Sequence, residues 1–215
     1  MSETTTTYYK KEFWATENLK YTAPHFRLEK AARLLNSIAG RRECDLLDLG
    51  CGPAALMDLL RPNIHYYGID IAVQRPGLQF REMDFVEAPI RFGDMRFDLV
   101  IAQGVFEYIG NVQEQKFAEI RDLLNDGGRF VVTYVNFDHC RRHIYWPYNN
   151  VRPFDDFYSS LSKTFRVERY FPTSHRWHHD EPRRRIIKAL QSHININIPV
   201  LSRLFAVEYF FVCSK

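Results

Sequence analysis

Short apolar runs alternate with stretches of helical periodicity over most of the 215-residue chain. The apolar runs predict strands at seven places, namely 45–49, 65–70, 79–83, 97–102, 128–135, 164–171 and 207–213. Strands that alternate with helices favour a mostly parallel sheet with helices on both faces. The pattern therefore predicts an α/β fold, and the length suits a single domain over 1–215.

Helical periodicity is clearest in two segments, 24–39 and 112–125. In the second segment we expect Asn111 to cap the first turn, with Glu114 at the capping-box position three residues later. The buried stripe of this helix is expected to consist of Phe117, Ile120, Leu123 and Leu124. We expect the helix to stop at Asp126 and the two glycines after it, because glycine is favoured just past a helix end.

Two connections between predicted strands, 136–163 and 172–206, are unusually long. Long connections in compact domains usually carry extra helices or cover a functional site. We expect helices at 182–192 and 199–205, and we expect both connections to be insertions on the substrate side of the domain. Residues 1–40 should add a helix and a lid, with the aromatic side chains Tyr8, Tyr9, Trp14 and Tyr21 as its candidates.

Residues 45–54 carry the strongest chemical signal in the chain. Asp48 ends an apolar run, and Gly50, Cys51 and Gly52 follow it. This order predicts a buried strand, a tight glycine turn and then a helix. Glycine has no Cβ, so backbone at such a turn can approach a ligand closely. We therefore expect a nucleoside cofactor at this turn.

Acidic residues also follow the next two predicted strands. Asp70 ends the second strand, where its carboxylate can accept hydrogen bonds from both hydroxyls of a ribose. Its neighbour Ile71 is included among the cofactor-binding candidates. Asp84 follows the third strand and is placed to accept a hydrogen bond from an adenine amino group, with Phe85 flanking the ring.

Taken in order, these motifs resemble those of the class I S-adenosylmethionine-dependent methyltransferases over residues 20–135. The family's first motif is an acid, an apolar residue and then Gly-x-Gly-x-Gly, and here Ala54 replaces the last glycine. The resemblance implies S-adenosyl-L-methionine as the cofactor. It also implies a Rossmann-like, seven-stranded, mostly parallel sheet in the order 3-2-1-4-5-7-6, with a helical cap and an antiparallel strand at 207–213.

The same resemblance implies roles for single residues. Asp70 matches the family's ribose-binding acid and Asp84 its adenine-side acid, while Gln103 would meet the methionine part of the cofactor. The segment 105–109 is similar to the family's segment after the fourth strand, with Tyr108 at a position often held by histidine. Phe106, in the same segment, is counted among the cofactor-binding residues.

Two residues are candidates for catalysis. His139 lies just past the predicted fifth strand, where it can serve as a general base, and a loop histidine without a catalytic role is the competing interpretation. Tyr108 can form a wall of the acceptor pocket, and ordinary core packing is its alternative. His175, His178 and His179 lack the spacing of a zinc motif, so no metal site is expected.

Composition narrows the classes of partner. The net charge of +3 is too small to indicate nucleic acid, and the chain lacks the Asn/Asp-Pro-Pro-aromatic loop of related base methyltransferases. No apolar run is long enough to span a membrane. The four scattered cysteines are typical of reduced thiols in a cytoplasmic protein.

The expected function is therefore methyl transfer from S-adenosyl-L-methionine to the oxygen or nitrogen of a small molecule. A nicotinamide-dependent oxidoreductase is disfavoured, because its glycine motif normally lies near the chain start and lacks an acid at the position of Asp48. A catalytically inactive binding protein with a methyltransferase fold and an RNA or protein methyltransferase stay as alternatives. The sequence leaves a homodimer open.

Overall fold

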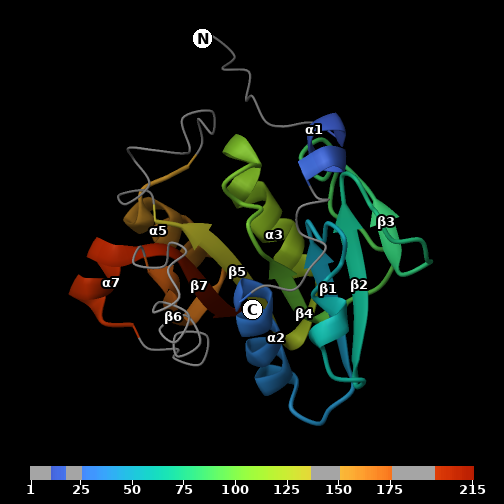
Figure 1. Cartoon of the computed structure of the whole chain (residues 1–215), viewed down its shortest axis with the longest axis horizontal. Coiled ribbons are helices and arrows are strands. Elements are labelled where there is room, and N and C mark those ends of the chain that lie inside the picture. The colour runs from blue at the N-terminus through green and yellow to red at the C-terminus, as the bar shows by residue number, and fades with distance from the viewer. Residues whose placement is uncertain (1–10, 18–25, 137–150, 176–196) are drawn as a thin grey trace, which may run out of the picture.

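Seven strands form one mixed sheet in the order β3-β2-β1-β4-β5-β7-β6 (Figure 1). This computed structural model describes residues 11–17, 26–136, 151–175 and 197–215. The strands are β1 (Cys44–Leu49), β2 (Ile64–Asp70), β3 (Phe80–Glu82), β4 (Phe97–Ala102), β5 (Leu124–Val135), β6 (Arg166–His175) and β7 (Ala206–Ser214). Neighbours from β3 to β5 are parallel, and β7 is antiparallel to both β5 and β6. The predicted fold class and strand order are confirmed.

Helices lie on both faces of the sheet. On one face, α2 (Phe26–Ala39) buries Leu35 in the same cluster as Leu46 and Phe210. On the other face, α3 (Gln113–Leu123) and α5 (Phe154–Thr164) bury Phe117 and Phe157 against the neighbouring strand positions. Successive residues of a strand point to opposite faces, so a strand that is apolar throughout supplies both layers of the core.

Shorter helices complete the described parts of the chain. They are α1 (Lys11–Glu17), α7 (Pro199–Phe205) and two 3-10 turns, η2 (Met57–Leu59) and η3 (Gly110–Val112). The helix predicted at 199–205 is confirmed as α7, whereas the one predicted at 182–192 lies outside the described residues. In the part of the chain that is described, no helix is both long and apolar enough to cross a membrane.

The helix expected after the glycine turn does not form. The connection 53–63 contains only the single 3-10 turn η2. Ala54 has a φ of 55°, a left-handed conformation that cannot continue a right-handed helix. Pro53 and Pro62 further restrict this short connection at its two ends.

The ends of α3 also differ from the prediction. Asn111 lies inside η3, and Val112 stands at the N-cap without a side-chain cap. The Glu114 carboxylate instead accepts hydrogen bonds from Ser160 Oγ at 2.9 Å and from Arg152 Nη1 at 3.2 Å. This contact with α5 takes the place of a local capping box.

The predicted stop at Asp126 was placed too late. The helix ends at Leu123, and Leu124 already pairs with Phe97 as the first residue of β5. Gly127, with a φ of 75°, therefore lies within the strand segment. Pairing with β4 ends the helix before the glycines are reached.

Candidate active site

A cavity of about 400 Å³ lies where the parallel strands β1, β2, β4 and β5 end. Its walls include the last residues of these strands and the loops that follow them, among them Asp48, Asp70, Gln103 and Val135. Ligand sites in open α/β sheets form at this edge, outside the carboxyl ends of the strands. The sheet topology therefore explains why residues far apart in sequence meet here.

The glycine turn forms one wall of the cavity. The N–H groups of Gly50 and Cys51 both donate to the Ile69 carbonyl, at 2.8 and 3.1 Å, which ties the turn to β2. Gly50 has a φ of 72°, and a Cβ there would lie 2.4 Å from Val105 Cγ2. Because neither the backbone angle nor the space admits a side chain, glycine is required at this position.

Asp70 is fixed between the glycine turn and its own strand. One carboxylate oxygen accepts the Gly52 N–H at 2.8 Å, and the other accepts the Ala72 N–H at 2.8 Å. The side chain is buried, yet it lines the cavity. Each carboxylate oxygen can accept more than one hydrogen bond, so Asp70 keeps capacity for a ligand's hydroxyl groups.

Asp48 is a buried acid in the floor of the cavity. Its carboxylate accepts a hydrogen bond from the Tyr66 hydroxyl at 2.5 Å. Burial, together with a smaller contribution from the nearby charge of Asp70, raises the pKa of Asp48 to about 7. The hydrogen bond from Tyr66 opposes this rise, because it favours the ionised carboxylate.

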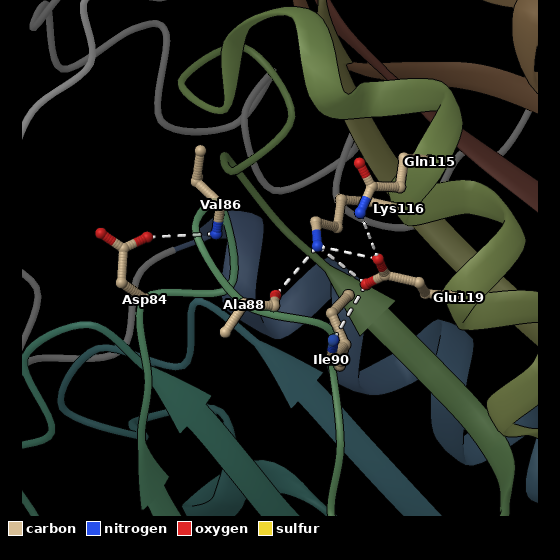
Figure 2. Close-up of polar contacts among 7 residues, drawn as sticks. All are labelled: Asp84, Val86, Ala88, Ile90, Gln115, Lys116 and Glu119. Atoms are coloured by element: carbon tan, nitrogen blue, oxygen red, sulfur yellow. Dashed lines mark hydrogen bonds and ion pairs between the residues drawn. The ribbon is translucent and has the colours of Figure 1, made fainter.

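Asp84 and Phe85 line the cavity at its β3 side. The Asp84 carboxylate accepts the Val86 N–H at 3.1 Å, so Asp84 both caps its own loop and faces the cavity. Figure 2 shows how this loop is joined to α3. Lys116 donates to the Ala88 carbonyl at 3.0 Å and pairs with Glu119, which in turn accepts the Ile90 N–H at 2.9 Å.

The segment after β4 places one expected site residue at the cavity and another in the core. Gln103 lines the cavity, and its amide oxygen and nitrogen are both buried without a hydrogen-bond partner among the described residues. Phe106 was expected to contact a cofactor, but it does not line the cavity. Its ring is 1% exposed and stacks on Phe117 at 4.8 Å, because Val105 occupies the cavity side of this segment.

Three charged residues that sequence reasoning did not assign to the site also line the cavity. Glu107 and Glu208 are each 3% exposed, and Arg27 of α2 forms an ion pair with Glu208. Burial raises the pKa of Glu107 to about 8, with a further contribution from the charge of Glu208. The signal for Glu208 was its position as the one acid within an apolar strand segment.

Tyr108 lines the same cavity as the two glutamates. Trp14 of α1 packs edge to face against the Tyr108 ring, with centroids 5.0 Å apart. His139, His178 and His179 lie outside the described residues, as do Tyr8, Tyr9 and Tyr21, so these assignments stay predictions. Within the described ranges, no group of three or more histidine, cysteine, aspartate or glutamate side chains could hold a metal ion.

The sheet order and this cavity define a Rossmann-like methyltransferase. Residues 23–192 match the sequence model of a methyltransferase domain family, which is more than half of the chain. The chain belongs to this methyltransferase family and is an S-adenosylmethionine-dependent methyltransferase. Comparison with curated proteins gives no significant match.

Several solved structures share this fold at low sequence identity. A TehB-like S-adenosylmethionine-dependent methyltransferase from Corynebacterium glutamicum is 16% identical with a TM-score of 0.58, covering 95% of this chain and 97% of that one. The N-methyltransferase NodS from Bradyrhizobium japonicum, solved with S-adenosyl-L-homocysteine, is 13% identical with a TM-score of 0.57, covering 93% and 97%. A putative Haloferax volcanii methyltransferase, solved in complex with the Trm112 methyltransferase activator, is 15% identical with a TM-score of 0.64, covering 95% of each chain.

Proposed function

We propose that this protein binds S-adenosyl-L-methionine in the cavity and transfers its methyl group to an oxygen or nitrogen of a small-molecule acceptor. The main support for the proposal is that one cavity is lined by Asp70, Asp84, Gln103 and the turn 50–52. These residues come from the ends of different strands. Their side chains and backbone offer hydrogen-bonding groups for the ribose, the base and the amino acid of a nucleoside linked to an amino acid.

The polar groups in the cavity fit the cofactor. Asp70 would accept the ribose hydroxyls, while Asp84 and Phe85 would receive the adenine ring, and Ile71 lies in the same wall. The buried amide of Gln103 offers one donor and one acceptor that lack partners in the described structure. An amino acid end carries both an ammonium donor and a carboxylate acceptor, so it would satisfy both atoms.

In this proposal Cys51 shapes the cavity and takes no part in the chemistry. Burial raises the pKa of its thiol far above the usual range, so the sulfur stays protonated and unreactive. The thiol instead packs under the glycine turn, where a Cβ on Gly68 would come within 2.7 Å of Cys51 Sγ. Its contribution is to shape the floor of the cavity.

Positioning is the main task of the chain in the proposed reaction. When bound, the cofactor supplies an electrophilic methyl group attached to a positively charged sulfur. Asp70 and Asp84 would hold the nucleoside end and Gln103 the amino acid end, which leaves Glu107 and Tyr108 for the acceptor. Trp14 and Tyr108 would exclude water from the acceptor, and a fixed geometry of this kind accounts for most of the rate gain in such a displacement.

The location of the Arg41–Arg42 pair favours a small acceptor over nucleic acid. Arg41 and Arg42 are exposed and directly precede the β1 segment, at the edge of the sheet opposite the cavity. The RNA or protein alternative draws support from the Haloferax neighbour, which is complexed with a methyltransferase activator. The buried thiols of Cys44, Cys51 and Cys213 form no disulfide, which suits the cytoplasmic location that we propose.

Calorimetric titration with S-adenosyl-L-homocysteine, with NADH titrated alongside, tests the cofactor. We expect saturable binding of S-adenosyl-L-homocysteine only. Asp70→Ala should weaken it by about 10-fold to 100-fold, the range for losing a hydrogen bond to a charged group. Asp94→Ala, at an exposed position outside the cavity, should leave the affinity unchanged.

Two outcomes would contradict the proposal. Equal affinity of the folded Asp70→Ala variant would show that Asp70 does not hold the ribose. Binding of S-adenosyl-L-homocysteine without methyl transfer to any acceptor, when small molecules, RNA and protein are screened with labelled S-adenosyl-L-methionine, would favour the non-catalytic alternative.

A further inference from the structure

Two buried glutamates, Glu107 and Glu208, line the cavity close enough for their charges to interact. Glu107 follows β4 and Glu208 lies near the start of β7, so they reach the cavity from two separate parts of the sheet. Each side chain is 3% exposed. Burying a carboxylate is costly unless other groups satisfy it, so the hydrogen bonding of this pair is informative.

Each glutamate keeps one carboxylate oxygen without a partner in the described structure. The Oε2 atoms of Glu107 and Glu208 are both buried and receive no hydrogen bond. Arg27 pairs with the other oxygen of Glu208, and Lys30 lies close enough for its charge to interact with Glu208. The Lys30 ammonium itself donates to the Pro172 carbonyl at 2.8 Å. The cations of α2 therefore leave two acceptor atoms unsatisfied.

The chemistry of these atoms restricts what can bind beside them. Above about pH 8 Glu107 is ionised, and an ionised carboxylate only accepts hydrogen bonds, so its partner must be a donor. A cation bound beside Glu107 would favour the ionised form at lower pH as well. A hydroxyl group supplies one donor and no charge, whereas an ammonium group supplies up to three donors and a positive charge. The aromatic rings of Trp14 and Tyr108 line the same cavity, and such rings attract cations.

We infer that Glu107 and Glu208 form a binding site for the ammonium group of the methyl acceptor, so that the acceptor is an amine. This inference rests on the proposed function and narrows its substrate class from oxygen or nitrogen to nitrogen. Gln103 and the glycine turn stay assigned to the cofactor. The pair of glutamates is a separate subsite, which we call the acidic wall.

The acidic wall also contains a base that can accept a proton from the bound ammonium. An ammonium cannot attack, because its nitrogen has no free electron pair. Transfer of one proton to the Glu107 carboxylate leaves a neutral amine, whose lone pair forms the new carbon–nitrogen bond. The carbon–sulfur bond of the sulfonium breaks, and its electron pair stays on sulfur, so charge and atoms balance.

One other ammonium could occupy the acidic wall, namely that of the cofactor's own amino acid end. The two sources predict different results for Glu107→Gln, which keeps the shape of the side chain but removes its charge. If the wall binds the acceptor, the variant binds S-adenosyl-L-homocysteine as the parent protein does. If the wall binds the cofactor, that affinity falls.

The decisive measurement is calorimetry with benzylamine and benzyl alcohol, on protein saturated with S-adenosyl-L-homocysteine. Both are titrated at about pH 8.5, where Glu107 is mostly ionised and benzylamine is still mostly protonated, and the alcohol is the neutral counterpart of similar size. We expect the parent protein to prefer benzylamine by about tenfold or more, as a charge-assisted hydrogen bond allows. Glu107→Gln should abolish the preference, and Glu43→Gln, an exposed acid before β1, should retain it.

The outcomes separate this inference from the function on which it rests. No preference in the parent protein, a preference that survives in Glu107→Gln, or a matching loss of S-adenosyl-L-homocysteine affinity would each overturn the acidic wall as an acceptor site. If the parent protein does not bind S-adenosyl-L-homocysteine at all, the proposed function fails instead. The benzylamine preference, measured on the protein alone, then still decides whether the wall binds ammonium.

Discussion

Asp48 and Glu107 are acids that the fold buries beside the cavity, and burial raises the pKa of both, to about 7 and about 8. In the unfolded chain each would ionise near its ordinary value, close to 4. The folded state therefore binds more protons than the unfolded state between about pH 4 and pH 8. Under these conditions, both residues make folding less favourable as the pH rises.

The free energy of unfolding should accordingly show a pH dependence that Glu107→Gln reduces. At pH 5 Glu107 is protonated in the folded state, so the parent and the variant should unfold at similar temperatures. Above pH 8 the parent carries a buried charge that faces Glu208, Arg27 and Tyr134, and the variant does not. The variant should then be more stable, by about 5 kcal/mol at most, since one pKa unit corresponds to about 1.4 kcal/mol.

Thermal unfolding followed by circular dichroism from pH 5 to pH 9 measures this difference. Glu43→Gln serves as the matched control, because Glu43 is exposed and should shift the curve little. A difference between the parent and Glu107→Gln that does not vary with pH would mean that Glu107 ionises normally in the folded protein.

Single residues were predictable where a motif set their type and spacing. Asp48, Asp70 and Asp84 all line the cavity, as their places at strand ends indicated. Glu107 and Arg27 lacked such a signal, because an acid in a loop segment and a base on a helix are usually solvent-exposed. Val105 lines the cavity and Phe106 stacks on Phe117, and the sequence does not tell which of two such adjacent apolar residues faces the core.

At the scale of elements, α3 and the loop 84–90 behave as one unit. Lys116 is 0% exposed, and its ammonium is satisfied by the Ala88 carbonyl and by Glu119. Glu119 also receives the Ile90 N–H, so the C-terminal part of this loop, 88–90, is held by one helix (Figure 2). The position of Asp84 and Phe85 therefore depends on two side chains that do not themselves line the cavity.

Lys116→Met should loosen this loop and weaken cofactor binding. The substitution leaves Glu119 without its charge partner and the Ala88 carbonyl without its donor, which should cost about 3 kcal/mol of stability. Urea unfolding measures that loss, and titration with S-adenosyl-L-homocysteine under native conditions measures the effect on the cavity. Arg121→Met, at an exposed position of the same helix, is the control and should change neither.

Strands were predicted more reliably than the ends of helices. Buried parallel strands are short apolar runs, so 97–102 matches β4 and 45–49 falls inside β1. The absent helix after Gly52 reflects backbone geometry at Ala54, which the sequence pattern does not reveal. The start of α3 depends on Arg152 and Ser160, residues distant in sequence that local capping rules cannot include.

At the scale of the whole molecule, α1 covers the cavity through contacts with separate parts of the sheet. Lys11 forms an ion pair with Glu82 of β3, and Gln74 donates to the Ala15 carbonyl at 3.4 Å. Trp14 reaches Tyr108 on the far side of the glycine turn. We therefore expect α1 to act as the lid that the aromatic N-terminal segment predicted.

Trp14→Ala should accelerate the release of S-adenosyl-L-homocysteine. An edge-to-face ring pair contributes about 1 kcal/mol, which corresponds to about fivefold in a rate. Stopped-flow displacement measures the dissociation rate. Thr16→Ala, at an exposed position on the same helix, should leave that rate unchanged; equal rates for the parent and Trp14→Ala would rule out a lid.

The place of β7 in the sheet has a consequence for the order in which the protein is made. β7 is the last of the seven strands to be synthesised, yet it lies between β5 and β6, and β6 pairs with no other strand in the described sheet. Asn136 at the end of β5 receives the incoming strand through its bonds to the Val207 and Ala206 carbonyls. Glu208 belongs to β7. During synthesis on the ribosome, the residues that we propose to bind the cofactor are therefore made before Glu208 completes the acidic wall.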